Sequence, residues 1–265
     1  MSLVQTSWLD DAAGIAELRL ARAPVNALDP ELCTALREAV DSSVANGARA
    51  IVLSADRRPD GPTVFSAGLD VPLLLSLGDD RERLRAAWES FFDAARALAS
   101  CPVPVVAAIG GHAPAGGCVL ALCCDYRVMA TSADPDKPLR IGLNETQVGL
   151  AVPEGVQRLL RRVVGAYRAE RLLVAGEMVD GAHAQAIGLV DALVPADDVT
   201  GHAAAWLGRL LALPQPAMLR TRAIARADVF EAMQPEHIAL ESFLDAWYAP
   251  ATQQALHALV ARLRK

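Results

Sequence analysis

One glutamate, Glu145, lies in an otherwise uncharged run over residues 141–149 (Ile-Gly-Leu-Asn-Glu-Thr-Gln-Val-Gly). Two turns of small residues precede it, over residues 65–70 (Phe-Ser-Ala-Gly-Leu-Asp) and 114–118 (Pro-Ala-Gly-Gly-Cys). Small residues let a ligand approach the backbone, so two such turns could direct N–H groups at one carbonyl oxygen. A carboxylate beside a doubly hydrogen-bonded carbonyl can move a proton next to a thioester.

Taken alone, each of these features has an ordinary structural explanation. A double glycine often serves only to allow close helix packing, and a loop glutamate is usually exposed to water. If Glu145 is instead buried among Leu143, Val148 and Leu150, we expect its pKa to be raised. The sequence has no metal-ligand cluster, Ser-His-Asp set, phosphate-binding loop or dinucleotide-binding glycine motif. We therefore expect no metal site and no cofactor.

Composition limits the class of partner. The formal net charge of −6 argues against nucleic acid or an anionic membrane surface as the main partner. Lys137 and Lys265 are the lysines of the chain, so arginines must neutralise any polyanionic ligand. The five cysteines lack paired spacing and are expected to be buried and reduced. No secretory signal and no bilayer-length apolar run is visible, so we expect a cytoplasmic protein without a membrane partner.

The first half of the chain alternates strands and helices. Residues 14–20 alternate apolar and polar side chains, as a half-buried strand does. Asp29, Pro30 and Gly47 are typical of the cap, first turn and end of a helix. Further strands are predicted over residues 50–53, 63–65, 103–109 and 125–129, and helices over residues 80–99 and 114–124. This alternation indicates an α/β fold.

From Pro153 the pattern is mainly helical, with one returning strand over residues 189–194. Residues 199–264 predict three or four amphipathic helices separated by prolines. This tail is too aromatic for a small solvated appendage and needs a core or a partner subunit (Trp206, Phe230, Phe243, Trp247, Tyr248). We divide the chain into a core that carries the chemistry, residues 1–198, and a helical region, residues 199–265.

Residues 22–28 (Arg-Ala-Pro-Val-Asn-Ala-Leu) and the two small-residue turns resemble the crotonase (enoyl-CoA hydratase/isomerase) superfamily. Within it, the second turn and residues 124–127 and 141–149 look closest to the mitochondrial-type delta-3,delta-2-enoyl-CoA isomerases. The resemblance implies a crotonase (ClpP-like) spiral of ββα units with a C-terminal α-helical oligomerisation region. It also implies a homotrimer or a dimer of trimers.

The same resemblance implies roles for individual residues. The N–H groups of Ala67 and Gly116 would form an oxyanion hole, the second at a helix start where the dipole favours negative charge. Glu145 would carry a proton from C2 to C4 of a 3-enoyl-CoA through a dienolate, giving 2-trans-enoyl-CoA in fatty acid β-oxidation. Coenzyme A would belong to the substrate. The residues expected to bind the acyl-CoA are Ala67, Gly68, Leu69, Asp70, Val71, Gly116, Asn144 and Arg22.

Other reactions catalysed within the superfamily use additional acidic side chains. Hydratases use two glutamates, and the position of the first is occupied here by Val119, which cannot transfer a proton. Dienoyl-CoA isomerases use an aspartate whose nearest position is Val152, two residues from Glu154. The alternatives are therefore an enoyl-CoA hydratase or other crotonase-fold acyl-CoA enzyme with Glu154 as second acid, or a non-catalytic acyl-CoA binder.

Several residues have two possible roles. Asp70 could line the pantetheine path or cap the next helix. Asn144 could bond the acid or the acyl chain, or only shape a turn. Arg22, with Arg57 or Arg58, could face the coenzyme A phosphates, although a solvated surface role is more common for any one arginine. His112 could titrate near neutral pH, but a lone loop histidine is more often incidental.

Overall fold

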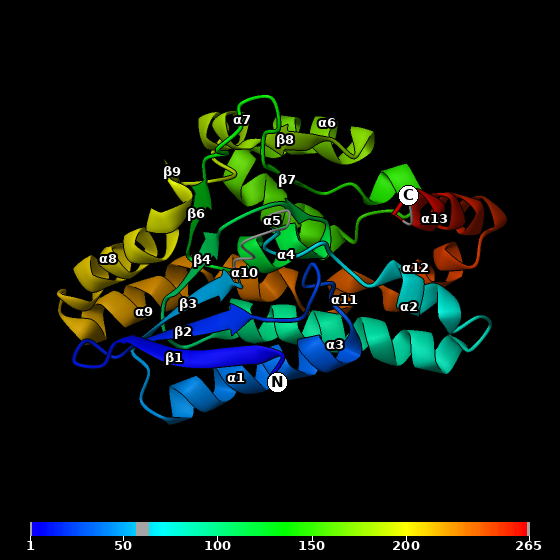
Figure 1. The fold of residues 1–265 in the computed structure, drawn as a ribbon. Helices are drawn as coiled ribbons and strands as arrows, with labels where there is room; N and C mark the ends of the chain where they lie inside the picture. The colour runs from blue at the N-terminus through cyan, green and yellow to red at the C-terminus, as the bar shows by residue number, and fades with distance from the viewer. Residues whose placement is uncertain (1, 57–63, 264–265) are drawn as a thin grey trace.

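The computed structural model describes residues 2–56 and 64–263, so Arg57, Arg58 and Thr63 lie outside the described residues. Two sheets form its centre (Figure 1). The larger sheet contains, in spatial order, β1 (Val4–Asp10), β2 (Ile15–Leu20), β3 (Ala50–Ala55), β4 (Val105–Ile109), β6 (Tyr126–Ala130) and β9 (Ala192–Val194). Its strands are parallel except for β1, which is antiparallel to β2. The smaller sheet contains β5 (Ala113–Pro114), β7 (Arg140–Gly142) and β8 (Met178–Asp180).

The chain passes repeatedly from the larger sheet to the smaller one and then into a helix. After β4 it forms β5 and then α4 (Gly116–Leu122), and after β6 it forms β7 and, further on, α5 (Glu154–Val164). After β3 the corresponding place is taken by Val64, which pairs with His112 only as an isolated bridge. The strand predicted over residues 63–65 is therefore reduced to this bridge at Val64, and it is wrong at Phe65, which lies in a bend. Each turn of the chain repeats a strand, a shorter strand or bridge, and a helix.

The two long helices of the first half begin with side-chain caps, of which Asp29 was predicted. Asp29 accepts a hydrogen bond from the Leu32 N–H at 2.8 Å at the start of α1 (Pro30–Ala45). Asp80 does the same for Arg83, at 3.0 Å, at the start of α3 (Arg81–Ser100). These side chains satisfy N–H groups that a first helical turn leaves without partners. The remaining helices before the C-terminal region are α2 (Val71–Ser76), α6 (Ala166–Ala175) and α7 (Gly181–Ala186), with 3₁₀ turns η1 (Glu145–Val148) and η2 (Ala196–Asp198).

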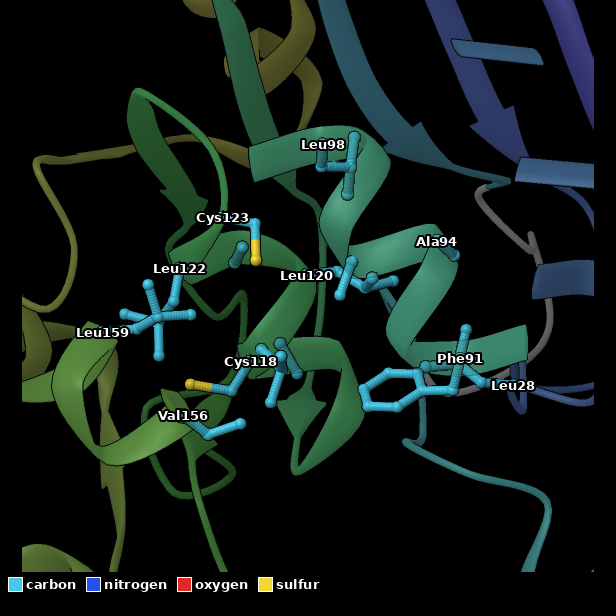
Figure 2. Close-up of a cluster of buried hydrophobic side chains, with 14 of the residues drawn as sticks. Leu28, Phe91, Ala94, Leu98, Cys118, Leu120, Leu122, Cys123, Val156 and Leu159 are labelled. Carbon is cyan, nitrogen blue, oxygen red and sulfur yellow. The ribbon is translucent and has the colours of Figure 1, made fainter. Parts of the chain in front are cut away.

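Helix α4 lies at the centre of the main core, and all seven of its residues are buried. Figure 2 shows it between α3, which contributes Phe91, and α5, which contributes Val156 and Leu159. The helix is made of small and aliphatic residues, so neighbouring helices can approach it from several sides. A glycine pair at its start is thereby fixed against the rest of the core.

The C-terminal region forms six helices within residues 199–263, rather than the three or four predicted. The excess arises because single turns break the pattern; Ala239, for example, adopts a left-handed conformation (φ 49°) between two of the helices. Helix α8 covers one face of the larger sheet, whereas later helices pack into the main core. The helices are α8 (Val199–Leu211), α9 (Gln215–Ala225), α10 (Ala227–Ala232), α11 (Pro235–Ile238), α12 (Leu240–Trp247) and α13 (Pro250–Leu263).

The aromatic residues of this region mostly find partners within the chain. Phe243 and Trp247 are buried and pack edge-on against Trp88 of α3, with ring centroids 4.4 and 6.1 Å away. Trp206 stacks on Tyr126 at 4.6 Å. Among residues 2–56 and 64–263, no helix combines the length and the hydropathy needed to cross a bilayer. Helices α10 to α12 pack into the same hydrophobic core as α3 and α5. The division of the chain at residue 198 therefore stays a prediction.

Candidate active site

A cavity of about 600 Å³ lies between the β-rich core and the last helices. Its walls are mostly apolar and come from segments far apart in the sequence, including residues 22–27, α3, and helices α12 and α13. Of the predicted site residues, Gly68 does not line it; the others do: Arg22, Ala67, Leu69, Asp70, Val71, Gly116, Asn144 and Glu145.

The two small-residue turns meet at one wall of this cavity. A Cβ atom on Gly68, whose φ is +81°, would lie 3.4 Å from the Gly116 nitrogen and 3.2 Å from the Ala115 Cβ. A Cβ atom on Gly117 would lie only 2.8 Å from the Ser66 carbonyl oxygen. Glycine is required at both positions because a side chain would push the two backbones apart. The predicted convergence of the turns is confirmed.

A third segment, residues 22–28, holds the first turn in place. The Asn26 side chain donates to the Phe65 carbonyl at 3.2 Å, and the Ser66 hydroxyl donates back to the Asn26 carbonyl at 2.8 Å. Asn26 is buried and has a positive φ of 48°, which asparagine tolerates better than most residues. The sequence analysis quoted this residue without finding its role.

The available backbone donors differ by one position from those expected. The Ala67 N–H donates to the Val25 carbonyl at 3.0 Å, so it is not free to bind a ligand. The N–H groups of Leu69 and Gly116 have no acceptor among the residues that the structure describes, and both residues line the cavity. This corrects the assignment of Ala67, whose N–H instead fixes the turn that carries Leu69.

Glu145 begins the 3₁₀ turn η1 and reaches the same cavity. The residue as a whole is partly exposed, but its carboxylate oxygen Oε2 is fully enclosed and has no hydrogen-bond partner among the described residues. Burial disfavours the charged form and raises the pKa of Glu145 to about 7. Its titratable neighbour Cys118 is buried in α4, which raises the pKa of that thiol and keeps it neutral. The surface-loop explanation of Glu145 is therefore excluded.

The second carboxylate among the described lining residues, Asp70, is already engaged. It accepts from the Leu73 N–H at 3.0 Å as the cap of α2 and forms an ion pair with Arg22 at 2.7 Å. Arg22 also pairs with Asp29 at 2.7 Å. Two carboxylates thus neutralise the Arg22 guanidinium, which corrects the expectation that it faces coenzyme A phosphates. Asp70 has the capping role, although it also lines the cavity.

The remaining candidate acid lies elsewhere. Val119 lines the cavity, whereas Glu154 does not. Glu154 is exposed and forms an ion pair with Arg158 at 2.8 Å, and the hydrogen bond from Arg158 lowers the pKa of its carboxyl. Val152 is buried outside the cavity lining. Among the described lining residues, Glu145 is the one carboxylate without an ion-pair partner.

Two polar residues of the sequence analysis have other surroundings. His112 lies outside the cavity lining, where its Nδ1 accepts from the Arg140 N–H at 3.1 Å and burial lowers its pKa. Asn144 lines the cavity but makes no side-chain hydrogen bond to any residue that the structure describes. The structure thus gives His112 a backbone hydrogen bond away from the cavity, and Asn144 is free to face a ligand.

Residues 10–255 match the family model described as Enoyl-CoA hydratase/isomerase. The chain belongs to the enoyl-CoA hydratase/isomerase family. It is 31% identical over 259 residues to the mitochondrial enoyl-CoA delta isomerase 1 of Homo sapiens, covering 97% of this chain and 82% of that protein. It is 35% identical over 233 residues to a probable enoyl-CoA hydratase, echA17, of Mycolicibacterium paratuberculosis, covering 86% and 84% of the two chains.

A crystal structure of the human mitochondrial delta3-delta2-enoyl-CoA isomerase superposes with a TM-score of 0.88 at 31% identity. The match covers 99% of this chain and 98% of that chain. The crotonase fold expected from the resemblance is thus confirmed, and the chain is an enzyme of the enoyl-CoA hydratase/isomerase family. Because relatives named for both reactions share about a third of their residues with it, the reaction must be argued from the site.

The sequence analysis did not identify the cavity wall that the C-terminal helices form. Phe243 and Trp247 of α12 and Leu256 and Leu259 of α13 lie more than ninety residues beyond Glu145 in the chain. They pack over the same space as Trp88 of α3. The aromatic richness of the tail was the available signal, but it indicated burial without a location.

Proposed function

We propose that this protein is a delta-3,delta-2-enoyl-CoA isomerase, which moves the double bond of a 3-enoyl-CoA to give 2-trans-enoyl-CoA. The observation that carries the proposal is the presence of one unpaired carboxylate, Glu145, in a cavity where the position of a second acid is occupied by Val119. Hydration needs two groups to position and split a water molecule. A double-bond shift needs one group that accepts and returns a proton.

The proposed reaction begins when ionised Glu145 removes a proton from C2 of the thioester. The thioester oxygen then gains negative charge as the dienolate forms, and the N–H groups of Leu69 and Gly116 stabilise that charge. Losing one such donor typically costs roughly 3–4 kcal/mol of transition-state stabilisation. Protonated Glu145 then delivers the proton to C4. A pKa near neutrality suits both steps, because neither form of the carboxyl is strongly favoured.

The size and chemistry of the cavity support an acyl-CoA substrate. About 600 Å³ of mostly apolar space beyond the two turns suits an acyl chain, and the turns expose backbone to the thioester. We propose a role in fatty acid β-oxidation for an enzyme with this substrate class. Coenzyme A is part of the substrate, and the proposed reaction uses no metal ion and no further cofactor.

The assembly and location also remain proposals. Helix α9 buries none of its residues within the chain, and Ile224 on α9 and Phe230 on α10 are 65% and 47% exposed. These exposed apolar side chains support a homotrimer or a dimer of trimers, in which a second subunit would cover them. The expected cytoplasmic location is a prediction, and the relatives from Homo sapiens and other mammals are named as mitochondrial.

Incubation with 3-hexenoyl-CoA and 3-dodecenoyl-CoA in deuterated water tests the proposal. We expect 2-trans-enoyl-CoA as the product, with deuterium at C4 in only part of the molecules, because an enclosed carboxyl exchanges its proton slowly with solvent. Recovery of 3-hydroxyacyl-CoA from 2-enoyl-CoA in the same buffer would favour the hydratase alternative. Tight acyl-CoA binding without turnover of either ester would favour the non-catalytic binder.

A further inference from the structure

Side-chain hydrogen bonds hold the turn that carries Glu145 from two sides. Some of these side chains belong to the turn itself, and another belongs to a neighbouring helix. On one side, the Thr146 hydroxyl donates to the Leu173 carbonyl at 3.2 Å, and the Gln147 amide donates to the Gly176 carbonyl at 2.8 Å. Both acceptors lie at the end of α6. Backbone atoms at a helix end thus anchor η1 on this side.

On the other side the anchor comes from the C-terminal region. The Thr252 hydroxyl of α13 donates to the Gly149 carbonyl at 3.0 Å. Thr252 is only 3% exposed, which is unusual for threonine and shows that its hydroxyl is placed in a packed contact. A Cβ atom on Gly149 would lie 2.9 Å from the Thr252 oxygen, so helix and turn are already as close as backbone permits.

Gly149 transmits this contact directly to the acid. It ends η1 in a left-handed conformation (φ 79°), and its N–H bonds back to the carbonyls of Glu145 and Thr146. The Leu150 N–H also donates to the Glu145 carbonyl at 3.1 Å. A shift of Gly149 would therefore move the backbone of Glu145, whose carboxylate oxygen Oε2 has no hydrogen-bond partner among the described residues.

The same face of α13 also borders the acyl space. Leu256 and Leu259 follow Thr252 by four and seven residues, so the three side chains lie along one side of the helix. Both leucines line the cavity. Figure 1 shows α13 beside α12 and α2 at the end of the molecule where the cavity lies. One rigid helix thus contacts both the distal cavity and the turn of the acid.

We propose that Thr252 is a positioning residue for Glu145, and that α13 couples filling of the distal cavity to the placement of this acid. The inference rests on the proposed function of the site and extends it to the dependence on the acyl chain. An acyl chain that reaches Leu256 and Leu259 holds α13 against the core. Thr252 then holds Gly149, and Glu145 is held at the reacting carbon atoms. A short acyl chain leaves this restraint weaker.

The test compares Thr252→Val, which has the same shape without the donor, with Thr252→Ser, which keeps the donor. Gln253→Met is the matched control, because Gln253 on the same helix donates to the Trp247 carbonyl of α12 at 2.7 Å and not to η1. For Thr252→Val we expect kcat to fall roughly three- to tenfold with little change in KM, as loss of one net hydrogen bond predicts. Thr252→Ser should retain most of the wild-type kcat, and Gln253→Met should retain all of it.

The chain-length dependence provides the second readout. In the wild type, kcat should be higher for 3-dodecenoyl-CoA than for 3-hexenoyl-CoA, and this ratio should approach one in Thr252→Val. A wild-type ratio of one would overturn the coupling. Equal losses in Thr252→Val and Gln253→Met would show that α13 was merely loosened, which would overturn the positioning role.

A readout without turnover separates this inference from the proposed function. Infrared titration of the protonated carboxyl band of Glu145, identified by its loss in Glu145→Gln, reports the placement of the acid in the free protein. Thr252→Val should admit water and move the midpoint to lower pH by roughly half a unit, while Gln253→Met leaves it unchanged. An unmoved midpoint in Thr252→Val overturns the positioning role. Inactivity of the wild type toward both esters would instead count against the isomerase proposal alone.

Discussion

The two sides of the catalytic cavity are built in different ways. The donor side, with Leu69 and Gly116, is fixed by backbone packed against backbone inside the core, where glycines allow contacts that no side chain would. The acid side, with Glu145, is a single 3₁₀ turn near the surface that side-chain hydrogen bonds hold from outside. The contrast indicates that the proposed charge-stabilising groups are held by close backbone packing, whereas the proposed proton-transfer group is held by contacts with α6 and α13.

The largest expected effect concerns the acid side. Glu145→Gln removes the proton carrier while keeping the shape of the side chain. Turnover of 3-enoyl-CoA should fall by roughly 10³-fold, within the range that positioned acids and bases contribute. Steady-state kinetics with 3-hexenoyl-CoA, together with calorimetric titration of a saturated acyl-CoA, should show lost kcat and nearly unchanged binding. Retained turnover would remove Glu145 from the mechanism and leave the comparison of the two sides without a basis.

The next effect concerns the donor side. Gly117→Ala places a methyl group 2.8 Å from the Ser66 carbonyl oxygen and should force the two turns apart. Because the two N–H groups would then no longer meet at one oxygen, kcat should fall about 10²-fold. Gly208→Ala in α8 is the control, since its Cβ would have no heavy atom within 4 Å. The control should keep full activity and gain up to roughly 1 kcal/mol of stability. Equal activity of both variants would show that the donor side is not rigid.

The buried acid should also make the free energy of unfolding depend on pH. The folded pKa of Glu145 is about 7, above its ordinary value of 4.5, so between these values the folded chain keeps a proton that the unfolded chain has lost. Stability from this group is thus full below pH 4.5 and is lost as pH rises towards 7, by on the order of 2–3 kcal/mol. Urea unfolding should show Glu145→Gln more stable than the wild type at pH 8 and equal to it at pH 4.

Glu154 provides a control for that measurement, because its pKa is shifted in the opposite direction from that of Glu145. Glu154 is exposed, and the hydrogen bond from Arg158 lowers its pKa. Glu154→Gln should therefore lower the free energy of unfolding slightly at neutral pH, whereas Glu145→Gln raises it. A wild type whose stability did not differ from that of Glu145→Gln at any pH would contradict the enclosed position of the carboxyl.

The smallest effect concerns the link between the donor side and its supporting segment. Arg22→Met leaves Asp29 and Asp70 without their cation and should cost about 1–2 kcal/mol, because the pair is only partly buried. Thermal unfolding should detect this as a lower Tm. Binding of coenzyme A should change less than about threefold, as expected for a cation that is already paired. If Arg22→Met instead bound coenzyme A roughly tenfold more weakly with an unchanged Tm, Arg22 would be a phosphate ligand.

The sequence was most informative where local chemistry decides the structure. Asp29 caps α1 at the predicted position because a side-chain oxygen next to a first helical turn has one favoured partner. The two turns could be paired from their glycines. Ala67 and Leu69 could not be told apart, because the answer depends on whether Val25, 42 residues before Ala67, accepts the hydrogen bond. Such pairings arise from tertiary contacts that no local pattern records.

The same limit explains the C-terminal region. Its prolines and aromatic residues predicted helices with a buried side, but nothing in them indicates that Trp247 packs on Trp88 or that Thr252 meets Gly149. The ion pairs of Arg22 could not be predicted for a related reason. A charge pattern shows that an arginine is available, whereas its neutralisation by Asp29 and Asp70 depends on where two distant carboxylates lie.

The walls of the cavity come from separate segments between Arg22 and Leu259, so parts of the polypeptide that are far apart in sequence contribute to one volume. Contacts between such distant segments form late, because the entropy of closing long loops must be overcome first. During translation, the β-rich core can collapse while its aromatic groove still faces water. Until α12 and α13 have been synthesised, we expect the nascent chain to expose the apolar residues of this cavity, a kind of surface that favours aggregation.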